Sequence, residues 1–255
     1  VGLIITPWNY PIVSNCGGIA AALSTGNRVI LKPSSKSVLT AWLICQCFWK
    51  AGVSKNTLQF LPAHGSALGK QLYTHPDIAF CVLTSRRSTA MEIYSNNPDL
   101  HLLAETGGKN ATIVTAVSDR HQAIKNILLS AFSQGGQRSS STSLLILEKE
   151  VFEDEAFKNS LIDAASSFKI GSAWDPENRS GPLIEEPDAD LSRALTRLEE
   201  GEEWALKPER IDGNLTCWSP AIKWNVQPGS FTHLTELFGP VLGVMKADNM
   251  EQAIE

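Results

Sequence analysis

The chain has 255 residues, of which 43% are hydrophobic and 19% charged, a balance typical of a globular protein with a sizeable core rather than a disordered chain. Its 22 Lys and Arg residues and 27 Asp and Glu residues leave a formal net charge of −5, which argues against binding to nucleic acid or to anionic membranes. No apolar run reaches the ~18 residues of a membrane span. No targeting segment is recognisable, so we expect a protein of the cytoplasm or the mitochondrial matrix.

The five cysteines are odd in number and lack the CxxC spacing of a redox or zinc motif. We therefore expect reduced, buried thiols rather than disulfides, and the scattered histidines give no reason to expect a metal site. The cysteines are Cys16, Cys45, Cys47, Cys81 and Cys217.

Apolar runs and helical segments alternate through the first hundred residues. Strands are predicted at 2–6, 28–32, 57–61, 79–84 and 101–105, and helices at 14–25, 37–51, 68–73 and 88–95. The strand candidates are almost continuously apolar, which is typical of parallel strands covered by helices on both faces. The pattern predicts a doubly wound α/β sheet with a nucleotide at the carboxyl ends of its strands.

The rhythm changes after Gly107 and Gly108. Strands are predicted at 111–114, 143–147, 221–224 and 241–245, helices at 119–132, 150–167 and 188–199, and one turn of helix at 249–255. The segment 172–187 reads as a loop, and the acidic run 199–203 as a solvated loop. A first lobe over 1–108 and a second α/β lobe over 109–255 is the simplest division.

Six short motifs occur in a fixed order, and together they are specific although each is weak by itself. They are TPWNYP (6–11), GNRVILKPS (26–34), ETGGKN (105–110), GGQRS (135–139), GPLI (181–184) and ELFGPV (236–241). In this order the chain resembles the aldehyde dehydrogenase superfamily from end to end. The resemblance is closest to the pyrroline-5-carboxylate (glutamate γ-semialdehyde) dehydrogenases of proline catabolism. The stretches FKIGSAWD and QPGSFTHLTELFGPVLGVMK resemble the long bifunctional proline-utilisation proteins.

The resemblance implies a Rossmann-like cofactor lobe followed by a catalytic lobe, and both are expected to be incomplete because members of the family are longer. The family's reaction joins a cysteine thiolate to an aldehyde, transfers a hydride to a nicotinamide and hydrolyses the thioester. Asn9 matches the side-chain donor of the oxyanion hole, and Glu105 matches the general base. Taken alone, Asn9 could equally cap a turn and Glu105 could be an ordinary carboxylate at the end of a strand.

The position of the family's nucleophile is where this sequence departs from the pattern. Gly136-Gln137-Arg138 is followed by Ser139 instead of the family's Cys, and the interval from Glu105 equals the family's, so the alignment has not slipped. A serine hydroxyl is not ionised at neutral pH without a paired base, whereas a thiol can be tuned to a thiolate. We therefore expect dehydrogenase activity to be severely reduced or absent. An engineered replacement and a natural pseudoenzyme both remain open.

The resemblance also implies a nicotinamide cofactor, NAD or NADP. Lys32 matches the lysine on the adenosine ribose, Glu236 the carboxylate on the nicotinamide ribose, and Phe238 the ring beside the nicotinamide. The full set assigned to the cofactor is Thr6, Pro7, Trp8, Lys32, Ser34, Ser35, Ser85, Arg86, Glu236 and Phe238.

Two departures bear on that cofactor. Ser35 stands where NAD-preferring members often carry Glu, which removes a charge that repels a 2′-phosphate and favours tolerance of NADP. Ser85 and Arg86 replace the Gly-Ser of the family's phosphate turn, so the turn loses a residue free to adopt positive φ. Arg86 and Arg87 either grip phosphate or fill its site, or they form a solvated pair, and cofactor binding stays open.

Three functions follow from these departures. The first is a glutamate-semialdehyde dehydrogenase-type protein that acts on a small aldehyde, with its activity impaired at Ser139. The second is a catalytically dead scaffold subunit of a larger assembly, in which a protein partner or a second copy covers exposed edges. The third, an ester hydrolase using Ser139, is disfavoured because the sequence places no base beside it.

Overall fold

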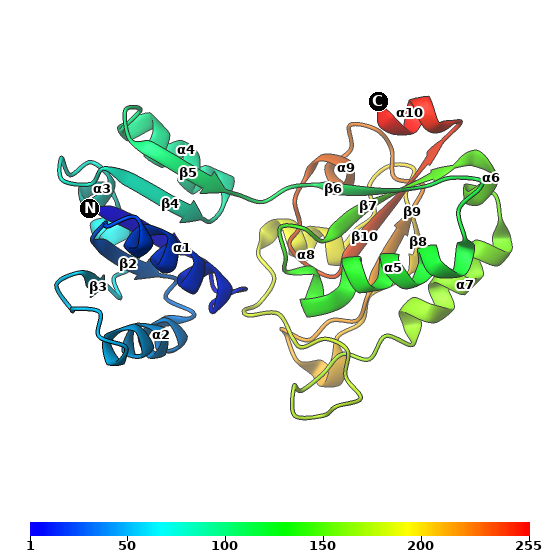
Figure 1. Cartoon of the computed structure of the whole chain (residues 1–255). Coiled ribbons are helices and arrows are strands. Elements are labelled where there is room, and N and C mark those ends of the chain that lie inside the picture. Colours follow the sequence, from blue (N-terminus) through cyan, green and yellow to red (C-terminus); the bar gives the residue numbers. More distant parts are fainter. The chain divides into compact units, whose positions relative to one another are not determined.

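In the computed structural model the chain divides into two compact units, Val1–Gly107 and Gly108–Glu255 (Figure 1). Residues 1–64 and 68–255 are described in full, and 65–67 by their helical backbone alone. Helices long and apolar enough to cross a membrane are absent from this described part. The unit boundary lies one residue before the predicted one, whereas the roles of the two lobes stay predictions.

The first unit is a five-stranded sheet in the order β3-β2-β1-β4-β5, with every neighbouring pair parallel. Its strands are β1 (Gly2–Thr6), β2 (Val29–Pro33), β3 (Leu58–Phe60), β4 (Phe80–Thr84) and β5 (His101–Glu105). The connecting helices are α1 (Val13–Ser24), α2 (Val38–Lys50), α3 (Gly65–Tyr73) and α4 (Arg87–Asn96). The predicted order of elements is confirmed throughout this unit.

Helices cover both faces of this sheet because successive strand residues point to opposite sides. Ile4 packs in one buried cluster with residues of α1 and α2, such as Ile19 and Ile44. Its neighbour Leu3 packs in another with residues of α3 and α4, such as Tyr73 and Ile93. The doubly wound arrangement predicted from the apolar runs is therefore present.

The second unit is a five-stranded sheet in the order β6-β7-β10-β9-β8 (Figure 1). Its strands are β6 (Asn110–Val114), β7 (Thr142–Glu148), β8 (Glu203–Leu206), β9 (Ala221–Trp224) and β10 (Val241–Ala247). Its helices are α5 (Arg120–Phe132), α6 (Lys149–Phe152), α7 (Glu155–Ser166), α8 (Ala189–Thr196), α9 (Phe231–Leu234) and α10 (Met250–Ile254), with 3₁₀ turns at Ser133–Gly136 and Ile211–Gly213. β8 pairs antiparallel with β9, and the other pairs are parallel.

One predicted helix, 150–167, is wrong because Asp154 divides it. The Asp154 carboxylate accepts hydrogen bonds from the backbone N–H groups of Ala156 and Phe157, at 3.0 and 3.2 Å. This is an N-cap, and it favours the start of a new helix over the continuation of the old one. The helix predicted at 188–199 also ends earlier, at Thr196, where Arg197 becomes extended.

The expectation that all five cysteine thiols are buried is wrong. Cys47 is exposed and Cys16 half-buried, so only Cys45, Cys81 and Cys217 are buried thiols. Burial raises the pKa of the Cys81 thiol to about 12, which makes it inert at neutral pH.

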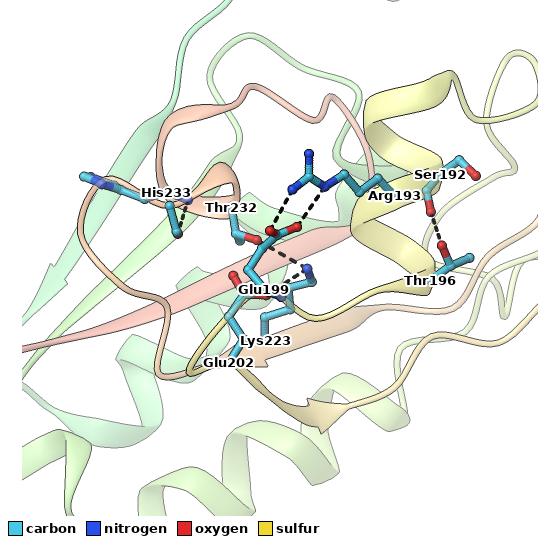
Figure 2. A network of polar contacts seen from close by, with 9 residues as sticks. Ser192, Arg193, Thr196, Glu199, Glu202, Lys223, Thr232 and His233 are labelled. Carbon is cyan, nitrogen blue, oxygen red and sulfur yellow. Dashed lines mark hydrogen bonds and ion pairs between the residues drawn. The ribbon is translucent and has the colours of Figure 1, made fainter.

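The acidic run 199–203 is not a solvated loop, because Glu202 lies inside the second unit (Figure 2). Its carboxylate binds the Lys223 ammonium at 3.0 Å, and both side chains are 0% exposed. Lys223 also donates to the Thr232 hydroxyl at 3.3 Å, and Glu202 accepts from the Glu199 backbone N–H at 2.9 Å. Sequence reasoning missed this pair because Glu202 lies just before β8 and Lys223 lies in β9, 21 residues further along the chain.

We expect Lys223→Met to destabilise the protein by about 3 kcal/mol, because it leaves the Glu202 carboxylate buried without its cation. Adding Glu202→Gln should restore more than half of that loss. Urea unfolding of both variants measures the effect, with Lys169→Met in the exposed Lys169–Glu177 pair as the control, expected within about 0.5 kcal/mol of the parent. An equal, small loss for Lys223→Met and the control would contradict a buried pair.

Candidate functional site

The catalytic and cofactor-binding residues predicted in the first unit lie at one edge of its sheet, where β1, β2, β4 and β5 end. The pairing sets Thr6 opposite Pro33 and Thr84 opposite Glu105, so the segments that leave these strands emerge side by side. Parallel sheets bind ligands at their carboxyl edge. The structure brings together Thr6, Pro7, Trp8, Asn9, Lys32, Ser34, Ser35, Ser85, Arg86 and Glu105.

The loop after β1, which carries Trp8 and Asn9, is anchored from both sides. The buried Thr6 hydroxyl donates to the Asn15 amide oxygen at 2.7 Å, and the Asn15 amide nitrogen donates to the Pro11 carbonyl. Asn15 is 0% exposed and was not singled out from the sequence. It holds the two ends of the loop, and Asn9 lies half-buried between them.

The loop after β2 is joined to the end of β1. Ser34 donates its backbone N–H to the Thr6 carbonyl at 3.0 Å, which extends the sheet pairing by one residue. Lys32 is 8% exposed, and its ammonium donates to the Pro33 carbonyl at 3.5 Å, a weak contact. Burial lowers the pKa of Lys32. The Lys32 ammonium therefore keeps N–H donors for the hydroxyl groups of a ligand. Ser35, three residues further on, is exposed.

The predicted phosphate turn forms without a glycine. The Ser85 backbone N–H donates to the Glu105 carbonyl at 3.1 Å, and Ser85 does not take a positive φ. Arg86 follows as the extended residue at the start of α4, with its side chain exposed. The loss of the family's glycine therefore leaves the turn unstrained, and the N–H groups that open α4 stay next to two arginines.

In the second unit, two loops meet backbone to backbone near Ser139. Gly136 has φ +69°, and a Cβ on it would lie 2.2 Å from the Gly239 carbonyl oxygen. At Gly239 the atoms near such a Cβ are the methyl ends of the Leu191 side chain, the nearest at 2.4 Å, which can move. A glycine is therefore required at position 136, where the neighbour is backbone and φ is positive. This contact brings the GGQRS loop against ELFGPV, where Phe238 adopts φ +48°, a conformation sparsely populated by side-chain-bearing residues.

The buried Gln137 side chain ties a third motif to the same loop. Its amide oxygen accepts from the Ile184 backbone N–H at 2.9 Å, and its amide nitrogen donates to the Gln134 carbonyl at 2.9 Å. The Ser180 hydroxyl accepts from the Gly135 backbone N–H at 2.6 Å. The GPLI segment thereby fixes the loop that precedes Ser139.

Ser139 itself is exposed and sits in a turn closed by the Ser141 N–H, which donates to the Arg138 carbonyl at 3.1 Å. Within the described residues no acidic or basic side chain hydrogen-bonds its hydroxyl. The part of the chain described in full also holds no group of His, Cys, Asp and Glu able to bind a metal ion. The exposed hydroxyl therefore has no hydrogen-bonded base among the described residues of the second unit.

Glu236 is joined to the segment that opens the second unit. Its carboxylate accepts from the Gly108 backbone N–H at 3.1 Å. The next residue, Lys109, has an enclosed ammonium with no hydrogen-bond partner among the described residues. Burial lowers the pKa of Lys109 to about 8, against the opposing field of Glu236. Lys109 was not singled out from the sequence, although it lies within the ETGGKN motif.

The model of the aldehyde dehydrogenase family matches residues 1–255. The chain belongs to the aldehyde dehydrogenase family. One curated relative is 1-pyrroline-5-carboxylate dehydrogenase of Geobacillus sp. (strain WCH70), 28% identical over 270 residues, which cover all of this chain and 51% of the relative.

Solved structures of similar fold include the following two. Proline utilization A (PutA) from Corynebacterium freiburgense is 38% identical with a TM-score of 0.94, over 99% of this chain and 26% of that one. Betaine aldehyde dehydrogenase from Staphylococcus aureus, solved in complex with NAD+, is 25% identical with a TM-score of 0.89, over 99% of this chain and 52% of that one. This aldehyde dehydrogenase chain spans about half the length of the curated relatives it matches.

We expect Lys109→Met to stabilise the aldehyde dehydrogenase chain by about 2 kcal/mol at neutral pH, because it removes a buried charge. Between the folded-state pKa of about 8 and the unfolded value near 10.4, the unfolded state binds more protons, so wild-type stability rises with pH relative to the variant. The advantage of Lys109→Met should therefore vanish toward the upper value.

Urea unfolding at neutral and alkaline pH measures this difference. The control is Lys207→Met, which removes an exposed ammonium and is compared with Lys109→Met at each pH. A pH-independent difference in stability between Lys109→Met and the parent would show that the Lys109 ammonium is solvated.

Proposed function

We propose that this chain supplies part of a protein of the glutamate γ-semialdehyde dehydrogenase type, built to oxidise an aldehyde with NAD(P)+, and that Ser139 leaves this activity severely reduced or absent. The observation that carries the proposal is the local frame of Ser139. The Gly136–Gly239 contact and the Gln137 hydrogen bonds hold the loop before an exposed turn, as a nucleophile requires. The side chain at the end of that frame is a hydroxyl instead of a thiol.

The similarity to pyrroline-5-carboxylate dehydrogenases and to PutA supports the substrate class. In the proposed reaction Asn9 donates a hydrogen bond to the developing oxyanion, and position 139 attacks the carbonyl carbon. Glu105 then takes a proton from the water that cleaves the acyl–enzyme bond. With a hydroxyl at position 139 the first of these steps is slowest, because an un-ionised oxygen is a weak nucleophile.

The cofactor assignment is supported by the chemistry of the edge residues. When bound, the nicotinamide group accepts a hydride from the substrate carbon. The buried Lys32 ammonium suits a ribose hydroxyl, and the Ser85–Arg86 turn and the start of α4 suit the pyrophosphate. The Glu236 carboxylate can accept from the nicotinamide ribose, and the exposed Ser35 places no negative charge against a 2′-phosphate.

The proposal predicts that Ser139→Cys creates or strongly raises NAD(P)H formation from pyrroline-5-carboxylate, because a thiolate replaces a neutral hydroxyl. Absorbance of the reduced nicotinamide measures it, with circular dichroism to confirm folding. Ser140→Cys is the matched control, since it adds a thiol to the next exposed position and should give no gain. A folded Ser139→Cys variant as inactive as Ser140→Cys would reject the dehydrogenase proposal.

A second candidate is a catalytically dead scaffold subunit, which the exposed apolar side of α2 favours. Leu39 and Leu43 are 69% and 55% exposed one turn apart, and Trp42 lies beside them, as on a surface that a partner or second copy covers.

Calorimetric titration with NAD+ and with NADP+ separates the two candidates. The dehydrogenase-type proposal predicts saturable binding, with NADP+ tolerated because of Ser35. A well-folded chain that binds neither nucleotide would favour the scaffold.

A further inference from the structure

The side chain of Asn110 reaches the turn that carries Ser139. Its amide nitrogen lies 2.6 Å from the Ser139 carbonyl oxygen and 3.0 Å from the Ser141 carbonyl oxygen. Both partners can only accept hydrogen bonds, so the NH₂ group must face them and both of its protons are used. The two bonds therefore hold the peptide planes 139–140 and 141–142, to which these carbonyls belong.

An irregularity in strand pairing places Asn110 there. Asn110 pairs with Thr142, but the next residue, Ala111, pairs with Leu144, so Ser143 is an extra residue in β7. A bulge of this kind re-aims the side chains next to it. Asn110 consequently meets the turn before β7 rather than continuing the regular ladder.

Arg138 secures the other side of the same turn. Its guanidinium donates to the Ser130 carbonyl at 2.6 Å and the Leu129 carbonyl at 3.0 Å, at the end of α5, and to the Ser141 hydroxyl at 3.2 Å. One side of the turn is thereby held on α5. The carbonyl of position 139, which is nearest to the reacting side chain, is held by Asn110.

We propose that Asn110 is the positioning residue of the catalytic turn: its amide holds the backbone of position 139 in one orientation and so sets the direction of the side chain there. The role in catalysis rests on the dehydrogenase-type function proposed above, whereas the hold on the backbone does not. Asn110 touches the turn through its amide and acts on the reaction only through position 139.

The backbone hold is tested by peptide-resolved hydrogen exchange on the natural chain and on Asn110→Ala and Asn110→Asp. Loss of the two donors should speed exchange about ten-fold in peptides that span 138–142, because the turn loses the hydrogen bonds that keep it closed. Asn110→Asp should speed exchange at least as much, since a carboxylate has no proton to donate to the two carbonyls.

Thr112→Val is the matched control. It removes the side-chain hydrogen bond between the Thr112 and Thr142 hydroxyls, which lie 2.7 Å apart, and leaves both Asn110 bonds to the turn in place. Exchange over 138–142 in this variant should stay within about two-fold of the parent. Equal exchange in the folded Asn110→Ala variant and in Thr112→Val would overturn the proposal.

The catalytic consequence is measured in the Ser139→Cys background. Asn110→Ala should lower kcat about ten-fold and leave KM for NAD(P)+ unchanged, because orientation at position 139 changes and cofactor binding does not. A matching rise in KM with kcat intact would reject the positioning role. If Asn110→Ala speeds exchange over 138–142 but Ser139→Cys itself shows no dehydrogenase activity, the proposed function is rejected and the backbone hold is supported.

Discussion

Parallel pairing of strands is the constraint on which the arrangement of functional positions depends. In a parallel sheet every strand ends at the same edge, so residues scattered from Thr6 to Glu105 in sequence emerge beside one another in the first unit. The hydrogen bond from Ser34 to the Thr6 carbonyl and that from Ser85 to the Glu105 carbonyl carry the pairing just beyond the strands. The first residues of the loops at this edge are thus bonded as extensions of the sheet.

In the second unit, the motifs are brought together by a close backbone contact between loops rather than by the ends of parallel strands. Gly136 and Gly239 approach to a distance that excludes a Cβ, and this contact brings GGQRS and ELFGPV together. Gln137 then ties in the GPLI segment through two hydrogen bonds of its buried amide. Three motifs that are far apart in sequence thus form one local frame before Ser139.

The second unit also encloses charged side chains. Glu202 and Lys223 neutralise one another at 0% exposure, whereas the Lys109 ammonium is enclosed with no hydrogen-bond partner among the described residues. The burial that lowers the pKa of Lys109 disfavours its charged form. An enclosed ammonium without a hydrogen-bond partner lowers the stability of the fold. Lys109 follows Gly108, whose N–H binds Glu236, the residue that the family resemblance assigns to the cofactor.

Motif order and apolar periodicity are local properties of the chain, so the sequence was enough to predict the family, and the order of elements and the doubly wound sheet of the first unit. It could not determine that Asp154 divides a helix, because an N-cap and a helix interior compete within the same residues. It also misread Glu202 as solvated, since burial depends on a partner, Lys223, that only folding brings near. Likewise, the bulge that turns Asn110 toward Ser139 is visible in the folded chain alone, because strand register is a property of the paired sheet and not of either strand.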